Sequence, residues 1–195
     1  ISERWLHVNK NGAGFYEFTG SGYTLPPAEG FTIKGSFTSA EETAAVSTRN
    51  KGQVQNYVYV GKPHNGPYTR PIGTNADSYL VGNPYPSAMD ADKFIIDNTN
   101  TIHGGVYYYE DWGGDNTHLV NLAHAGYATY TLAGAVRKIA YNINSPYEEG
   151  NKLPARYIPV AQGFWVYGKG GGTVKFNNSQ RVYMTEADQT KSLLF

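Results

Sequence analysis

The chain has 195 residues, a formal net charge of zero and no cysteine. The neutral balance removes the basic surface expected of a nucleic-acid-binding protein, and the lack of cysteine excludes disulfides and thiolate zinc sites. Charged residues are only 16% of the chain, while tyrosine (17) and glycine (23) are abundant, which favours sheets joined by turns over helices. No apolar run is long enough to span a membrane, so we expect no membrane insertion. The neutral charge likewise leads us to expect no nucleic-acid binding.

In chain order, short alternating runs bounded by Gly, Asn or Pro predict β-strands. The clearest runs cover residues 14–20, 54–61, 104–112, 126–134, 163–168 and 172–178. Strands of this length at turn-bounded spacing predict an all-β fold, a β-sandwich. One or two short helices are expected beside it, at 39–46 and 87–98. Residues 135–157 end in a polar loop with Pro146 and Pro154, which we expect to be exposed.

Two segments of the chain echo each other. PPAEGFTIKG (26–35) and PVAQGFWVYG (159–168) align without gaps and share Pro, Ala, Gly, Phe and Gly. A duplicated strand unit suggests two similar sheet halves or subdomains. We place these at 1–75 and 76–195, with one continuous sandwich as the alternative. The alternative to duplication is a chance similarity between two strands that are both bounded by glycine.

The segment GNPYPSAMDADKFIIDN (82–98) allows two interpretations. Asp90, Asp92 and Asp97 could supply oxygen ligands to Ca²⁺, although the spacing lacks the pattern and the glycine of a calcium loop. In the alternative, the prolines fix a turn, and Ser87 or Asp90 caps a short helix. The apolar residues of that helix, Phe94 and Ile95, then enter the core. The turn-plus-helix interpretation fits the spacing better.

The segment YYYEDWGGDNTH (107–118) places aromatic rings beside carboxylates and amides, as in sugar-binding sites. Tyr107 and Tyr109 share one strand face and Tyr108 the other, so one set is core and one is available. The alternative is a hairpin with a solvated polar tip. A carbohydrate site here would draw on the following candidates: Tyr108, Asp111, Trp112, Asp115, Asn116 and Trp165.

Catalysis has less support in the sequence. Glu110 and Asp111 are adjacent, so as strand residues they point to opposite faces and make a poor acid–base pair. The histidines lack metal-ligand spacing, and no nucleophile elbow, phosphate loop or dinucleotide fingerprint occurs. A hydrolase would need carboxylates brought together from distant strands. We therefore expect no catalytic residues and no cofactor, with calcium as the exception described above.

Four long motifs occur in order: LVGNPYPSAMDADKFIIDN, GGVYYYEDWGGDNTH, AGYATYTLAG and YIPVAQGFWVYGKGGGTVKFNNSQR. This series resembles one in large surface proteins of Bacteroidota, where it precedes a C-terminal sorting domain for type IX secretion. The resemblance covers about residues 79–181. The tail VYMTEADQTKSLLF departs from the aromatic-basic strand usual there, and no sorting domain lies among these residues. Export by that route is thus what the resemblance implies.

The resemblance implies an exported, β-rich, non-catalytic module at the cell surface or released from it, and it supplies no ligand. Our leading hypothesis is a structural or adhesive module, an adhesin-like contact surface for a neighbouring protein or glycan, with self-association favoured by the neutral charge. The alternative is a carbohydrate-binding module attached to a polysaccharide-degrading enzyme, with an open aromatic platform.

Overall fold

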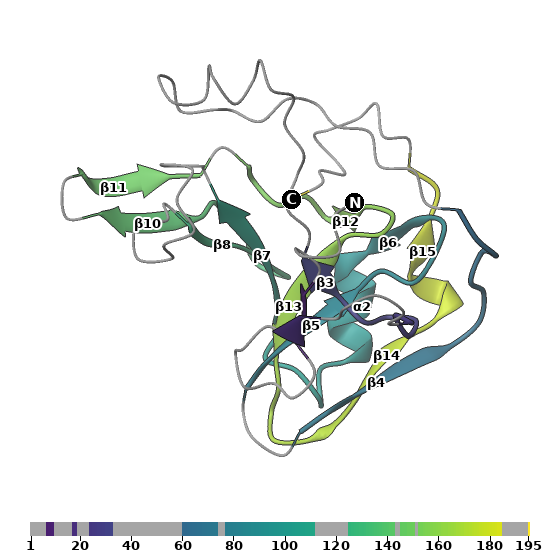
Figure 1. Cartoon of the computed structure of the whole chain (residues 1–195). Helices are drawn as coiled ribbons and strands as arrows, with labels where there is room; N and C mark the ends of the chain where they lie inside the picture. The colour runs from purple at the N-terminus through teal and green to yellow at the C-terminus, as the bar shows by residue number, and fades with distance from the viewer. Residues whose placement is uncertain are drawn as a thin grey trace.

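The computed structural model describes residues 7–9, 17–18, 24–32, 60–73, 77–111, 125–142, 145–150, 152–184 and 195. In this part of the chain, short β-strands dominate and one α-helix accompanies them, which confirms the all-β, sandwich-like prediction (Figure 1). The helix expected at 39–46 lies outside the described residues, as does most of the strand expected at 54–61. Of the strand expected at 14–20, only β2 (Glu17–Phe18) is described.

The largest sheet is antiparallel and has the strand order β5-β13-β7-β8-β9. Its strands are β5 (Ser78–Gly82), β7 (Gly105–Asp111), β8 (Ala125–Thr131), β9 (Gly134–Val136) and β13 (Gly163–Tyr167). The register sets Trp165 opposite Tyr107, and Tyr109 opposite Tyr127. Because side chains alternate along a strand, these four aromatic residues share one face, here called the outer face. The opposite, inner face carries the core.

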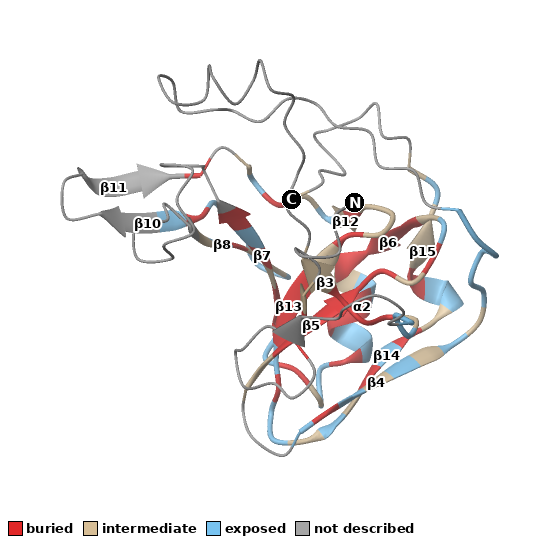
Figure 2. Ribbon diagram, viewed as in Figure 1, coloured by how far each residue is buried: buried red, intermediate tan, exposed pale blue. Residues whose placement is uncertain are grey.

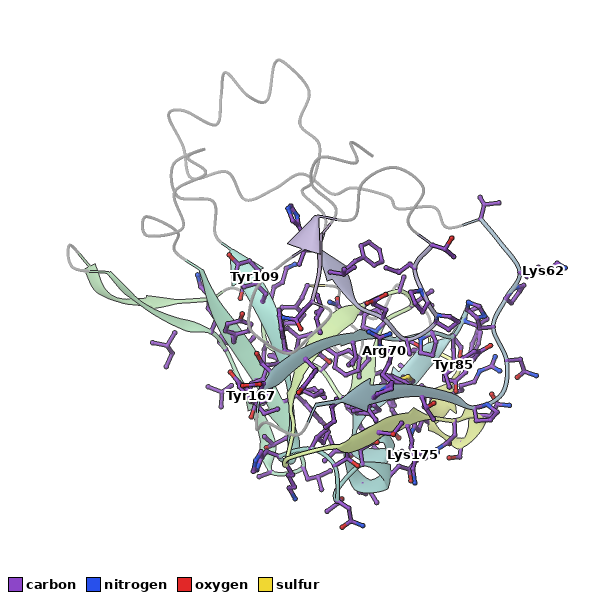
Figure 3. All side chains as sticks on the ribbon, turned by 60° about the horizontal axis from the view of Figure 1, so that its bottom comes forward. Lys62, Arg70, Tyr85, Tyr109, Tyr167 and Lys175 are labelled. Atoms are coloured by element: carbon purple, nitrogen blue, oxygen red, sulfur yellow. The ribbon has the colours of Figure 1, made fainter. Side chains whose placement is uncertain are left out.

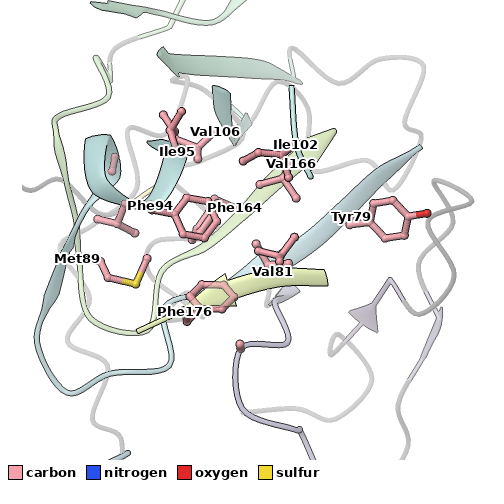
Figure 4. Close-up of a cluster of buried hydrophobic side chains, with 14 of the residues drawn as sticks. Tyr79, Val81, Met89, Phe94, Ile95, Ile102, Val106, Phe164, Val166 and Phe176 are labelled. Atoms are coloured by element: carbon pink, nitrogen blue, oxygen red, sulfur yellow. The ribbon is translucent and has the colours of Figure 1, made fainter. Parts of the chain in front are cut away.

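The core lies between the inner face, the helix α2 (Ala91–Asp97) and two small sheets (Figures 2 and 4). Phe94 of α2 contacts Phe164 of β13 and Phe176, with ring centroids 5.2 Å apart in both pairs. All three rings are fully buried, and each contributes about 1.5–3 kcal/mol by leaving water. The prediction that Phe94 and Ile95 enter the core is confirmed.

The two small sheets have the strand orders β12-β6-β15 and β14-β4. Their strands are β4 (Tyr68–Ile72), β6 (Ala88–Asp90), β12 (Tyr157–Ile158), β14 (Gly172–Phe176) and β15 (Arg181–Val182). A 3₁₀ turn, η3 (Asn178–Gln180), joins β14 to β15. Since β4 pairs with β14, strands from either side of residue 75 share a sheet.

A third small sheet comes from the N-terminal part of the chain. It has the order β2-β1-β3, so β1 (His7–Val8) lies in the middle and pairs with both β2 and β3 (Phe31–Thr32). A Cβ on Gly163 would point to the outer face and lie 3.5 Å from the carbonyl oxygen of Phe31. The backbone at β3 therefore lies over the outer face at the β5–β13 side.

The two echoing segments adopt the same turn on the two edges of β5. Ala28 and Ala161 occupy equivalent positions, and both have positive φ, 67° and 59°. Each turn closes with one backbone bond, from Glu29 N–H to the Pro26 oxygen (3.1 Å) and from Gln162 N–H to the Pro159 oxygen (3.4 Å). The segment after the first turn bonds one edge of β5, and β13 bonds the other. The echo in sequence thus corresponds to an echo in backbone conformation.

The polar loop expected at the end of residues 135–157 is confirmed in part, since 152–156 carry no strand and Leu153 is exposed, but the loop does not include Pro146. The chain forms the hairpin of β10 (Ile139–Asn142) and β11 (Ser145–Glu149), which projects from the body in Figure 1. Pro146 lies within β11, where a strand paired on one side tolerates proline. Pro154 is buried, and so is Lys138 just before the hairpin.

Candidate functional site

The turn at the start of the 82–98 segment is held by the buried side chain of Asn83. Its Nδ2 donates to the carbonyl oxygens of Ser87 and Pro159, both at 2.9 Å, and its Oδ1 accepts from the N–H of Tyr85 at 3.0 Å. One amide thus satisfies backbone groups of two chain segments that are far apart in sequence. This corner joins β5 to the strands that cover the inner face.

Asp90 caps α2 and binds Arg156. Its Oδ1 accepts from the N–H of Asp92 at 3.1 Å, and the guanidinium of Arg156 reaches both carboxylate oxygens, at 3.0 and 2.8 Å. Burial acts to raise the pKa of Asp90, but the hydrogen bonds and charge of Arg156 outweigh it and hold the pKa below its usual range. Asp92 accepts from the hydroxyl of Tyr130 at 2.8 Å and lies 3.2 Å from Arg156 Nε.

Asp97, at the other end of α2, binds the FNNSQR segment. Its Oδ2 accepts from Asn177 Nδ2 at 2.9 Å and from Gln180 Nε2 at 2.8 Å. Asn177 and Gln180 also form a capping box around η3. The polar residues of this motif therefore fasten the end of β14 to the helix.

The three aspartates do not converge on one point that could hold calcium. Asp90 and Asp92 bind Arg156, whereas Asp97 binds side chains at the opposite end of α2. Among the described residues, no group of three or more His, Asp or Glu side chains is arranged to hold a metal ion. The turn-plus-helix interpretation is confirmed, with Asp90 as the cap and a helix that begins at Ala91, after the strand β6.

The predicted sugar-binding residues do not form one platform in the described structure. Tyr108 is 2% exposed on the inner face and stacks on Phe195, with ring centroids 4.7 Å apart. Burial raises the pKa of its phenol far above the usual value. Trp165 lies on the outer face but is only 4% exposed. Asp111 ends β7, and the other three candidates, Trp112, Asp115 and Asn116, lie outside the described residues.

Several tyrosines of the large sheet reach solvent on the outer face, opposite to Tyr108. Tyr109, Tyr127 and Tyr167 are 39%, 44% and 41% exposed. Tyr109 and Tyr127 meet edge to face, with ring centroids 5.7 Å apart, and Tyr107 meets Tyr167 in the same way at 4.9 Å. These four residues form a surface here called the tyrosine face.

Glu110 lies on the buried side of β7. It shares the inner face with Tyr108 and is buried, and its Oε1 accepts from the N–H of Lys152 at 3.3 Å. Gly150 packs directly against the same carboxylate and against the stem of the buried Lys138. Burial lowers the pKa of Lys152, although the charge of Glu110 opposes this. A charged residue usually marks the solvent side of a strand, and here it does not.

A shallow hollow of about 150 Å³ lies between the two equivalent turns. Pro26, Pro27 and Phe31 line it on one side and Ala161 on the other, with His64 at its margin. Three polar residues, Glu29, His64 and Asn83, also line it, of which Glu29 accepts from Arg70 and Asn83 donates to backbone carbonyls.

Comparison with known proteins gives a family and no activity. A family model described as a domain of unknown function, DUF8693, matches residues 3–191. The chain belongs to the DUF8693 family. No curated protein and no solved structure matches it. Within the described part of this DUF8693 chain, the helix is too short and too polar to cross a membrane. The resemblance to Bacteroidota surface proteins stays a prediction, because the family carries no functional description.

Proposed function

We propose that this chain is a non-catalytic extracellular module of a bacterial surface or secreted protein, with a structural and adhesive role. The observation that carries the proposal is the tyrosine face. Tyrosine rings offer a large apolar surface and a polar hydroxyl at little conformational cost, which is why they are frequent in recognition surfaces. Here they stand on the strands of the largest sheet, which hold them in place.

The polar residues of the long motifs support the same proposal because they serve the fold. Asn83 holds the corner, Asp90 pairs with Arg156, and Asp97 fastens Asn177. A catalytic carboxylate needs freedom to exchange a proton with substrate, and these side chains are engaged by neighbouring groups instead. The extracellular location rests on the motif series described above.

Adhesion and catalysis are separable by one experiment. Beads carrying the purified chain are passed under flow over surfaces coated with polysaccharides, with matrix proteins or with the chain itself. We expect retention on at least one surface, lost in the Tyr109→Ala/Tyr127→Ala variant and kept in Tyr183→Ala. Tyr183 is a suitable control because it is 90% exposed and follows β15, in a different sheet.

The same coatings are assayed for soluble sugar or peptide products. Release of product by the purified chain would show an enzyme and overturn the proposal. Absence of retention on every coating, or retention unaffected by the double variant, would remove the adhesive role of the tyrosine face.

A further inference from the structure

We infer that the tyrosine face binds an uncharged, hydroxyl-rich glycan chain. The inference rests on the proposed function, since it names the partner of the same contact surface. It draws on the position of the rings, the lack of basic residues at the strand positions of the face, the area that the rings expose and the contacts that hold the rings.

The rings lie along a path that crosses three neighbouring strands. Tyr167 is on β13, Tyr107 and Tyr109 on β7, and Tyr127 on β8. Adjacent strands are about 4.8 Å apart, so the path is long enough for a few sugar rings and is narrow across its width. Figure 3 shows Tyr109 and Tyr167 on one side of the molecule, away from Arg70, Tyr85 and Lys175.

The strand positions on this face include no basic residue, and their one acidic residue, Asp111, falls at the end of β7 in phase with Tyr109. Between the tyrosines stand the half-buried hydroxyl residues Ser78, Thr129 and Thr131, on the same side of the sheet. Hydroxyls both donate and accept hydrogen bonds, and tyrosine adds an apolar ring for the C–H face of a sugar. An anionic polymer would find no opposite charge at these positions to offset the loss of its hydration.

The exposed area argues against a second copy of the chain as the occupant. A tyrosine side chain covers roughly 150–250 Å². At 39–44% exposure, Tyr109, Tyr127 and Tyr167 together show on the order of 250 Å², and Val136 at the neighbouring edge adds less than 100 Å². A stable protein interface buries about 800 Å² on each partner. These exposed side chains supply less than half of that area, which favours a slender ligand over a second copy.

The rings are also held in place before any ligand arrives. Tyr107 packs edge to face on Tyr167, Tyr109 on Tyr127, and Tyr127 on the buried Trp165 at 6.4 Å. Fixing a side chain in advance reduces the entropic cost of binding. One face of this size binds weakly, and many copies on a surface raise the apparent affinity by avidity.

The test is affinity electrophoresis of the purified chain through gels containing laminarin, mannan or starch as neutral polymers, and alginate or heparin as charged ones. We expect retardation by at least one neutral polymer. Tyr109→Ala and Tyr127→Ala should each weaken binding by about tenfold, in line with the loss of a buried aromatic contact. Tyr109→Phe, which keeps the ring, should retain most of the binding, and Tyr183→Ala should match the wild type.

Urea unfolding of each variant confirms that folding is unchanged, since the substituted rings are about two-fifths exposed. The inference fails if no neutral polymer retards the folded wild type, if only charged polymers do, or if the alanine variants bind equally well. In those cases retention on protein or on the chain itself in the flow experiment would leave the proposed adhesive role standing, with a different partner.

Discussion

Replacing Asn83 by alanine removes the side chain that closes the corner before β6. Three good hydrogen bonds are lost, to the carbonyls of Ser87 and Pro159 and from the N–H of Tyr85. Each is worth about 1 kcal/mol net, and a buried N–H left without an acceptor adds to the loss. We expect a decrease of about 3–4 kcal/mol in the free energy of unfolding, a large share of the roughly 5–15 kcal/mol typical of domains.

Urea unfolding followed by tryptophan fluorescence and far-UV circular dichroism measures this change. For a chain of 195 residues it corresponds to a fall in Tm of about 6–16 °C. Asn83→Asp keeps the acceptor for Tyr85 but replaces the donor by a carboxylate facing two carbonyls, so it should lose at least as much. Asn100→Ala, at an exposed position after α2, is the control and should change stability by less than about 0.5 kcal/mol.

A loss below about 1 kcal/mol for Asn83→Ala, with an unchanged m-value, would refute this reasoning. The corner would then be maintained by the neighbouring prolines and by core packing. A neutral effect of Asn83→Asp beside a large effect of the alanine variant would show that volume and not hydrogen bonding is decisive.

Three further predictions concern charge, burial and backbone strain. The lowered pKa of Asp90 stabilises the fold above the unfolded-state value of about 3.9 and stops doing so as pH falls through the lower folded value. The urea midpoints of wild type and Asp90→Asn should therefore converge in acid, and a pH-independent difference would contradict the Arg156 pairing. Burial and, to a smaller extent, the electrostatic effect of Tyr68 raise the pKa of Tyr85 to about 12. The neutral phenol therefore stabilises the fold below about pH 10, and this stabilisation is lost as the pH rises from about 10 to about 12. Tyr85→Phe should lose less stability over that range than wild type, and equal losses would count against it. Ala161→Gly should raise stability by about 0.5–1 kcal/mol in thermal unfolding, because the left-handed φ of 59° costs alanine more than the added unfolded-state entropy of glycine; a decrease would show that the turn is not strained.

Alternation made most of the C-terminal fold predictable. The strands β7, β13 and β14 fall inside runs identified from the period of two, and each begins at a glycine. The strands β5, β6 and β12 were missed because they are short or buried on both faces, so they lack a polar face to mark the period. In 126–134 the run was read as one strand, although a two-residue turn splits it before Gly134.

The orientation of β7 was not accessible from the sequence. Alternation shows that Tyr107 and Tyr109 oppose Tyr108, but the side that faces the core depends on what packs there. Glu110 is in phase with Tyr108, and a carboxylate usually marks the side of a strand that faces water. In the structure Glu110 is buried next to Gly150 and Lys152, two residues about forty positions away that no local pattern connects to it.

The most specific sequence motifs proved to be architecture, and this has a consequence for how the module can vary. Asn83 and Asp97 bind another motif of the same series, and Asp90 binds Arg156 just before it, so a change at any of the three disturbs the fold. The tyrosine face uses the positions of β7, β8 and β13 that point away from those contacts. Since alternating side chains lie on opposite sides of a sheet, the outward residues can change without altering the corner. A glycan-binding role would therefore allow ligand preference to differ between otherwise identical scaffolds, through substitutions at Tyr109 and Tyr127.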